Sequence, residues 1–418
     1  MGRIKRLFKS EAIGGILIIT ACILALIFKN SPLVDAYDSF INFKLGLIFG
    51  EYELIHATHG WANDGLMAIF FFYIGLEVKR EIMVGELSSP SRVALPIIGG
   101  IGGIVTPAIV FLLITWGNSF AMRGWAIPTV SDTALAVGVL LLLGSKIPPS
   151  LRIFLLLLAI IDDIAVVFII AIFYSANVSL VLLGVAGVIA LIMLAMNLLN
   201  VSKKTPYLIA LFFMWLCFLE SGVHATLGGI LASIFIPLKP IKGYSVARDL
   251  ENRLYGLITY FVMPVFAFSN AGILITNEAI SHLLHPVSIG IIVSLLVAKP
   301  VGIFLFSRVI IKVGISKLPI GANFMQFFGL CMLTGVGMSM SLFMCEIAYR
   351  GSTLFHSADR LSILIASFIA AVTGYAIMFI GEKNARAKIE SHDLEAKEKM
   401  MEAKKAIEEE NLKEVSIG

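Results

Sequence analysis

The chain has 418 residues, of which 58% are hydrophobic and 14% are charged, and its formal net charge is +4 at pH 7. This length and composition exclude a soluble globular protein, because a soluble domain carries many more charged residues on its surface. We therefore predict a polytopic membrane protein, and neither the composition nor the small net charge supports nucleic-acid binding. The four cysteines lie in apolar runs without metal-ligand or disulfide spacing, which favours small core residues.

The chain begins with a basic segment and an apolar run from residue 12 to residue 28. This combination is typical of a secretory signal, but no small-residue cleavage site follows the run. We predict that the run is a retained first membrane helix, with its basic flank on the inner side.

Apolar runs with the length of membrane helices recur along the chain. Lys and Arg gather in alternate connections between these runs, and this positive-inside bias places both termini on the cytoplasmic side. The fold class predicted from these patterns is all-α and polytopic, with about twelve transmembrane helices at residues 12–28, 59–84, 94–115, 121–144, 150–174, 179–199, 205–219, 223–236, 247–272, 287–310, 323–346 and 359–381.

The longest connection between predicted spans, residues 29–58, lies on the outer side. Residues 43–55 carry apolar and aromatic side chains around Gly50, a pattern that favours a short β-hairpin. Two-stranded hairpins are marginally stable alone, so we expect this one to pair with a second copy of the protein.

The composition changes abruptly after residue 381. Residues 1–381 form the predicted transmembrane domain, whereas residues 382–418 interleave Lys and Glu at helical spacing. We interpret residues 382–418 as a solvated, charged cytoplasmic tail.

Two adjacent carboxylates, Asp162 and Asp163, interrupt the apolar run from residue 155 to residue 174. Acids are costly at the middle of a membrane helix and indicate function there, although a neutral pair that only orients helices is the alternative. Successive helix residues point about 100° apart, so the two side chains face different partners. Burial and mutual repulsion favour a protonated acid, which can exchange its proton for a cation. We predict that the pair binds a cation and protons in competition.

Lys299 is the one basic residue at membrane depth, with about ten apolar residues on each side, whereas the other basic residues of the predicted spans lie near their ends. An unpaired ammonium is unfavourable at membrane depth, so we expect Lys299 to contact Asp162 or Asp163 and to be able to carry a proton. The alternative is a lysine that extends to the membrane surface. Pro300 follows Lys299 and is expected to bend the helix.

Two predicted spans contain interruptions where a membrane helix should be apolar. One has Pro128 followed by polar residues to Asp132, and the other has Thr334 to Gly337. Interrupted helices are tolerated at depth where they line a cavity, and paired interruptions in two halves mark transporter binding sites. Asp132 is then expected to offset the positive end of a half-helix or to bind the ion. A proline kink without functional consequence is the alternative.

Charged residues also gather at the membrane ends of the predicted spans. On the inner side these residues are Glu77, Arg80, Glu81 and Glu251. They are either ordinary surface charges or an ion-collecting, pH-responsive funnel. On the outer side, Asp64 is a candidate for the exit path. His224 is a lone histidine near the outer surface, where a solvated structural role is favoured over a pH sensor.

Six motifs carry a resemblance to a known family, and they occur in one order: NDGLMAIFFFYIGLEVKRE at 63–81, PTVSD at 128–132, AIIDD at 159–163, PVFAFSNAG at 264–272, AKPVGI at 298–303 and GVGMSMSLF at 335–343. Together they closely resemble the NhaA-type sodium/proton antiporters of bacteria, over about residues 10–381.

The resemblance implies a role for each matching residue. Asp163 and Asp162 are similar to the cation and proton site, and Lys299 to the partner of Asp162. Asp132 with Ser131 is similar to the charge-compensating centre of two crossed, broken helices, the second broken at Gly335 and Gly337.

The resemblance also implies inverted repeats, formed by spans three to five and ten to twelve, and a homodimer joined by the outer hairpin. Two departures from the family pattern bear on regulation and on the site. Asn252 stands where the best-known members have His, with Arg253 beside it, so the pH response of the family is not carried over; Ser131 replaces Thr and keeps the hydroxyl.

These observations together predict an electrogenic Na+(Li+)/H+ antiporter of the bacterial inner membrane that exports sodium by alternating access. It is expected to be a secondary transporter, not an enzyme, and to need no cofactor. An intramembrane aspartyl protease is disfavoured, because its two acids must approach one water from different helices. A passive cation channel and a transporter of an organic substrate remain alternatives.

Overall fold

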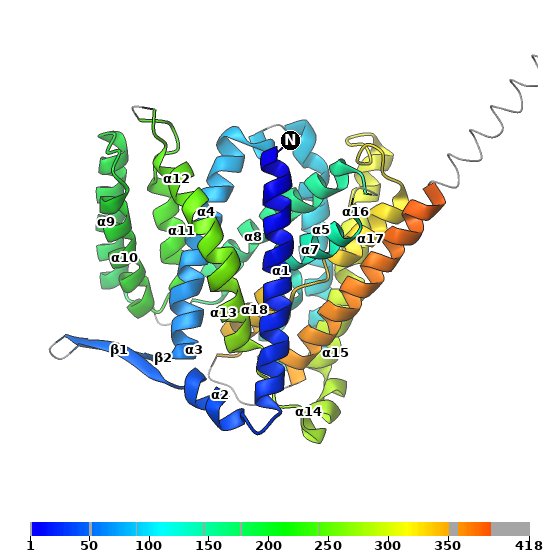
Figure 1. The fold of residues 1–418 in the computed structure, drawn as a ribbon, viewed down its shortest axis with the longest axis horizontal. Coiled ribbons are helices and arrows are strands. Elements are labelled where there is room, and N and C mark those ends of the chain that lie inside the picture. The colour runs from blue at the N-terminus through cyan, green and yellow to red at the C-terminus, as the bar shows by residue number, and fades with distance from the viewer. Residues whose placement is uncertain are drawn as a thin grey trace, which may run out of the picture.

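The computed structural model describes residues 2–49, 52–88, 90–144, 147–175, 178–241, 243–350 and 358–385. Helices dominate this part of the chain, and a two-stranded sheet projects from one side (Figure 1). The predicted all-α membrane class is confirmed. Residues 386–418 of the predicted charged tail lie outside the described residues.

Twelve predicted spans each coincide with one helix or with a run of consecutive helical segments. Within the described ranges, five helices are long and apolar enough to cross a membrane, and three bent helix pairs qualify when each pair is counted together. The shorter connecting elements are α3 (Thr58–Gly60), η1 (Trp61–Leu66), η2 (Glu86–Ser88), α14 (Asn277–Ser281) and η6 (His282–Leu284).

The helices form two bundles, and α1 (Gly2–Lys29) packs against both (Figure 1). We call the first the panel bundle; it contains α4 (Met67–Val84), α9 (Leu180–Leu198), α10 (Lys204–Glu220), α11 (Thr226–Phe235) and the run α12 (Val246–Leu257), η5 (Ile258–Val262) and α13 (Met263–Asn270). We call the second the site bundle; it contains α5 (Pro90–Ile114), α6 (Ser119–Met122), η3 (Arg123–Thr129), α7 (Thr133–Leu142), α8 (Pro149–Phe173), α15 (Pro286–Val293), η7 (Ser294–Ala298), α16 (Lys299–Val313), α17 (Phe324–Leu333), α18 (Met338–Ala348) and the last described helix, Ala358–Ala385.

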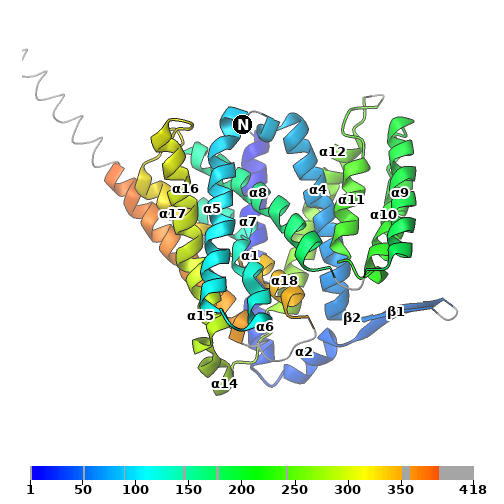
Figure 2. The same ribbon diagram turned by 180° about the vertical axis from the view of Figure 1, so that it is seen from behind.

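Two spans of the site bundle are broken, as the sequence predicts. The segments α6 and η3 meet α7 at an angle of 44°, and α17 meets α18 at 45°. The two breaks touch, since the Asp132 backbone N–H donates to the Val336 carbonyl at 2.7 Å. Figure 2 shows that α6 and α18 lie toward the side of the sheet, whereas α7 and α17 lie toward the opposite side. The broken helices therefore cross with opposite directions.

The helices α5 and α16 pack at a contact between two glycines. A Cβ atom on Gly102 would lie 2.4 Å from the Gly302 carbonyl oxygen, and one on Gly302 would lie 2.3 Å from the Gly102 oxygen. Small residues permit such close backbone approach between membrane helices. This contact holds Lys299, one turn before Gly302, next to α5.

Pro300 does not break its helix, because α15, η7 and α16 form one continuous span from Pro286 to Val313. The element before Lys299, η7, is a π-helical turn. Proline lacks an N–H and clashes with the preceding turn, and a wider turn can absorb that mismatch.

The predicted hairpin is confirmed as β1 (Lys44–Phe49) and β2 (Tyr52–Ala57), paired antiparallel with Lys44 opposite Ala57. Before it, α2 (Val34–Ile41) turns away from α1 by 118° and packs through Tyr37. Burial raises the pKa of Tyr37 to about 12, and its hydroxyl donates to the Phe268 carbonyl at 2.7 Å. These contacts attach the base of the hairpin to α13.

Candidate ion-binding site

Asp162 and Lys299 form a buried ion pair between α8 and α16. Lys299 Nζ lies 3.2 Å from Asp162 Oδ2 and 2.8 Å from the Thr129 carbonyl oxygen at the end of η3. The Lys299 charge thus faces both the carboxylate and the negative end of a half-helix. The expected contact between Lys299 and Asp162 is present, and Lys299 does not extend to the membrane surface.

Ser131 contributes to this pair from the first break. Its Oγ lies 2.7 Å from Asp162 Oδ2 and 3.0 Å from the Thr334 carbonyl oxygen at the end of α17. A hydroxyl has one proton, so Ser131 can donate to only one of these acceptors at a time. Asp162 Oδ1 is buried without a hydrogen-bond partner. Ser131 therefore links the second broken helix to the Asp162 carboxylate.

Asp163 lies in a different environment from its neighbour. Among the described residues, no group donates a hydrogen bond to its carboxylate. Asp163 is 8% exposed, whereas Asp162 is 2% exposed. A carboxylate oxygen without a fixed donor has its lone pairs available for a cation. The structure thus separates the two acids, as the 100° rotation between adjacent helix residues requires.

Asp132 caps both half-helices that start at the crossing. Its Oδ1 accepts from the Leu135 N–H of α7 at 3.2 Å, and its Oδ2 accepts from the Ser339 N–H of α18 at 3.1 Å and from the Ser339 hydroxyl. The positive ends of two helix dipoles converge on this one buried carboxylate. The geometry fits the expected charge compensation, and Asp132 contacts neither Asp162 nor Lys299.

The glycines of the second break provide space for the crossing. Neither Gly335 nor Gly337 has a positive φ. A Cβ on Gly335 would lie 2.4 Å from the Leu295 carbonyl oxygen, a backbone atom of η7, whereas one on Gly337 would meet the Ser341 hydroxyl at 2.3 Å. A side chain at position 335 is therefore excluded by the neighbouring backbone. A side chain at position 337 would meet only a serine side chain that can rotate away.

The inner cluster is centred on Arg80. Its guanidinium contacts Glu251 at 2.8 Å, Glu77 at 3.9 Å and the Glu81 carboxylate. All four residues belong to α4 and α12 of the panel bundle. The sequence prediction that they gather is correct, and one guanidinium among three carboxylates leaves the cluster with a negative formal charge.

Two basic residues close to this cluster in the sequence, Lys79 and Arg253, have other partners. Lys79 donates to the Ile234 and Ile236 carbonyls at 2.6 and 2.5 Å, at the end of α11. Arg253 pairs with Asp249 at 3.0 Å, on the exposed side of α12.

The outer candidates are more buried than predicted. His224 is 8% exposed, so the expectation of a solvated histidine is wrong, and its Nδ1 lies 2.9 Å from the Thr226 hydroxyl. Asp64 is also buried, with Oδ2 3.2 Å from Arg350 Nη2 and Oδ1 3.9 Å from His224 Nε2. An exit path through Asp64 would therefore require the Arg350 contact to open.

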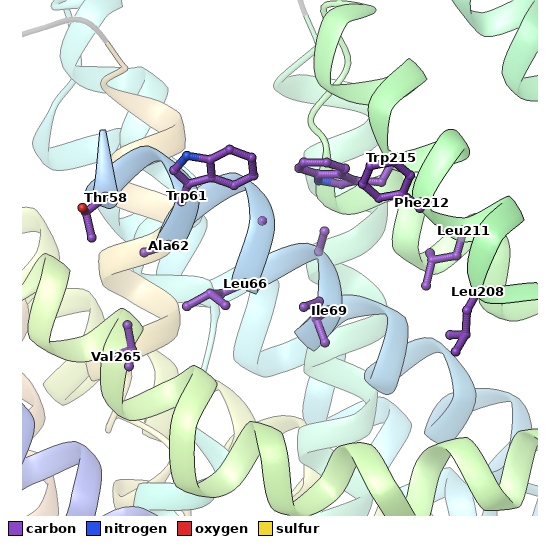
Figure 3. A pocket seen from close by; sticks show the side chains of 12 residues that line it. Thr58, Trp61, Ala62, Leu66, Ile69, Leu208, Leu211, Phe212, Trp215 and Val265 are labelled. Carbon is purple, nitrogen blue, oxygen red and sulfur yellow. The ribbon is translucent and has the colours of Figure 1, made fainter. Parts of the chain in front are cut away.

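An apolar pocket of about 400 Å³ lies beside the outer cluster, between α4, α10 and α13. Figure 3 shows Trp61 and Trp215 at its upper edge and Leu66, Ile69 and Val265 among its lining. No charged side chain lines this pocket, so it offers no ligand for a metal cation.

Sequence reasoning did not select three groups that the structure places at the site: the Thr129 and Thr334 carbonyls and Ser339. Carbonyls carry no signal in the sequence, because every residue has one. Ser339 lies two residues after the break at Gly337, close to the start of a half-helix. A serine at such a position is a signal for a contact with a helix cap.

The site geometry is thus one buried carboxylate–ammonium pair, one carboxylate without donors, and one carboxylate that caps two helices. Such an arrangement can hold a monovalent cation, exchange it for protons and keep the half-helix charges balanced.

A family model described as Na+/H+ antiporter 1 matches residues 5–378. The chain belongs to this Na+/H+ antiporter family. The matched range includes every residue of the site described above, so the resemblance stated from the six motifs is confirmed.

Curated relatives in this family cover nearly the whole chain. The Na(+)/H(+) antiporter NhaA of Campylobacter curvus is 50% identical over 90% of this chain and 94% of its own length. The antiporter NhaA 2 of Campylobacter fetus is 48% identical over 90% of this chain and 96% of its own length. The antiporter NhaA 1 of Campylobacter jejuni strain RM1221 is 44% identical over 89% of this chain and 96% of its own length.

Proposed function

We propose that the protein exchanges Na+ or Li+ for protons as a secondary active transporter, and that it exports the cation. One observation carries this proposal within the family: Asp163 has no fixed hydrogen-bond donor, whereas the adjacent Asp162 is paired with Lys299. The first acid is available to a cation, and the pair beside it can hold or release a proton.

The cycle follows from competition at this site. When the site faces the cytoplasm, Na+ displaces the proton of Asp163 and replaces Lys299 as the counter-ion of Asp162. When the site faces outward, a proton returns to Asp163, Na+ leaves, and the Asp162–Lys299 pair forms again. If Lys299 releases its own proton on Na+ binding, more than one proton moves per cation, and the exchange is electrogenic.

The remaining site residues have supporting roles in this proposal. Asp132 and the breaks at Gly335 and Gly337 keep the crossing stable without a bound ion, and Ser131 aligns Asp162. Glu77, Arg80, Glu81 and Glu251 form an inner approach whose net charge is negative, which attracts cations. Asp64 and His224 lie on the outer route.

We place the protein in the bacterial inner membrane with both termini in the cytoplasm, on the distribution of Lys and Arg. Residues 1–381 act as the transport domain, and residues 382–418 as a charged tail. We infer a homodimer through the hairpin, because Leu45 and Ile55 on its two strands are 50% and 39% exposed.

The decisive experiment measures exchange in everted membrane vesicles with an imposed pH gradient, from pH 6 to 9, with Na+, Li+ or K+. We expect Na+ and Li+ to release protons. The apparent KM for Na+ should rise as pH falls, by about tenfold per pH unit for each competing proton, because Na+ binds the deprotonated carboxylate. Cation flux that is unaffected by the proton gradient would indicate a channel instead and overturn the proposal.

The protease alternative is not favoured by the geometry. Asp162 and Asp163 are adjacent on α8 and face different partners, so they do not hold one water between them. Cleavage of a membrane peptide that depends on both acids would restore that alternative.

A further inference from the structure

Two arginines of the site bundle contact the panel bundle at its outer end. Arg350, just after α18, places Nη2 3.2 Å from Asp64 Oδ2 in η1, which runs directly into α4 of the panel bundle. Arg360, near the start of the last helix, places Nη1 3.4 Å from the Asn270 carbonyl oxygen at the end of α13. Both contacts join charged groups of one bundle to acceptors of the other.

In these contacts Asp64 and Arg360 are held in place by neighbouring groups, whereas the Arg350 side chain is 66% exposed. The Asp64 side chain is 9% exposed, and the backbone oxygen of Asp64 accepts from Trp215 Nε1 at 2.9 Å. Arg360 is fixed by Glu346 at 2.5 Å within the site bundle. A carboxylate as buried as Asp64 is destabilised when it loses its partner, so the Asp64–Arg350 contact favours the arrangement in which the bundles meet here.

An apolar layer lies between these contacts and the crossing of the broken helices. Phe343, halfway along α18, packs against Phe71 at 5.5 Å, Phe266 at 6.0 Å and His224 at 5.5 Å, measured between ring centroids. All three partners lie in or next to panel helices. On the outer side, two layers therefore close the boundary between the bundles. The arginine contacts form the outermost layer, and the aromatic contacts of Phe343 form the layer between them and the crossing.

The inner cluster has a different arrangement. Arg80, Glu81 and Glu251 all belong to the panel bundle, so their contacts can persist when the two bundles move relative to each other. The Arg350 and Arg360 contacts cannot persist if the bundles separate on the outer side.

We propose that the Asp64–Arg350 and Arg360–Asn270 contacts form an outer latch, which closes the ion site to the outer side and separates each time the site opens there. The proposal rests on the proposed antiport function and assigns its conformational control to residues that do not bind the ion. Loss of the latch shifts the protein toward the state that faces outward, and the fraction able to bind Na+ from the inside falls.

The first test tethers the latch. In a variant whose four cysteines (Cys22, Cys217, Cys331 and Cys345) are replaced by Ala, Asp64→Cys and Arg350→Cys are combined and joined with a short, reducible bifunctional thiol reagent. We expect the tether to stop Na+/H+ exchange in proteoliposomes and reduction to restore it, while Na+ still protects the protein from thermal unfolding.

The matched control tethers two residues within the panel bundle. Lys204 and Asp249 lie 2.9 Å apart on α10 and α12, so Lys204→Cys with Asp249→Cys is expected to keep its exchange when joined by the same reagent. Exchange that continues with the outer pair fully tethered would overturn the latch. Absence of exchange in the native chain, which keeps its four cysteines, would instead contradict the proposed function.

The second test weakens the latch without a tether. Arg350→Ala is expected to raise the apparent KM for Na+ supplied at the inner side by about three- to tenfold. Arg350→Lys keeps the positive charge and should raise this KM much less. Arg123→Ala is the control, because Arg123 is an exposed outer arginine that contacts Phe120 of its own bundle. An unchanged KM in Arg350→Ala, or an equal change in Arg123→Ala, would contradict the latch.

Discussion

Lys299 Nζ lies 3.2 Å from Asp162 Oδ2, and the exposed fractions of the two side chains are 0% and 2%. Breaking a buried pair from one side costs more than removing both partners, because the remaining charge has no counter-ion. Stability and transport can therefore be separated at this site.

Lys299→Ala is expected to lower the free energy of unfolding by about 3–5 kcal/mol, since it leaves Asp162 buried without a counter-ion. The double variant Asp162→Asn with Lys299→Gln should recover a large part of this loss. Thermal unfolding of the detergent-solubilised protein measures both. A single variant as stable as the parent would show that Asp162 does not need the lysine.

Asp163→Asn should abolish Na+/H+ exchange and leave stability within about 0.5 kcal/mol of the parent, because no described group donates to this carboxylate. Vesicle exchange and thermal unfolding, measured on the same preparations, test the two halves of this prediction. Sodium-dependent proton release that persists in the variant would rule out Asp163 as the cation ligand.

Asp132→Ala should destabilise the protein by about 1–4 kcal/mol, because one side chain caps α7 and α18 and each cap contributes about 0.5–2 kcal/mol. Asp132→Asn keeps one acceptor oxygen and should lose less. Ser339→Ala removes only the hydroxyl bond and serves as the comparison. If all three variants unfold like the parent, the shared cap has no energetic role.

Gly335→Ala should destabilise the protein by about 1–3 kcal/mol, because its methyl group would overlap the Leu295 carbonyl. Gly184→Ala in α9 is a matched control, since a Cβ there meets nothing within 4 Å. The control should be neutral or gain up to about 1 kcal/mol from the higher helix propensity of Ala. Equal effects in the two variants would show that the break tolerates a side chain.

Removal of residues 45–55 should convert a dimer to a monomer, because it deletes most of the two strands together with the exposed Leu45 and Ile55. Sedimentation of the detergent-solubilised protein measures the change. Leu284→Ser, at another strongly exposed position outside the hairpin, should leave the assembly unchanged. A dimer that survives the deletion would place the interface elsewhere.

The sequence predicts the spans and the centre of the site because charges and breaks are rare at membrane depth. Asp162, Asp163 and Lys299 are conspicuous for this reason, as is the interruption at Asp132. The partners of these residues are not local. Ser339 reaches Asp132 across 207 positions and Arg350 reaches Asp64 across 286, so no spacing rule connects them.

The error at His224 has the same origin. His224 is an isolated polar residue in the sequence, and Phe343, whose ring packs against it, comes from a distant helix. The π-helical turn before Pro300 was likewise not predicted, because no residue pattern in the sequence marks it.

The glycine contact between α5 and α16 has a consequence for how ion binding is sensed. Lys299 is the first residue of α16, and the backbones of α5 and α16 approach closely where Gly102 and Gly302 meet. The helix α5 also packs against α8, which carries the two acids. The backbones that carry the ammonium and the carboxylates therefore belong to one packed unit, and we expect the Asp162–Lys299 pair to separate and re-form through movement of the side chains. Sodium binding would then change the pairing of charges inside a stiff unit, and we expect that unit to move as a whole against the panel bundle.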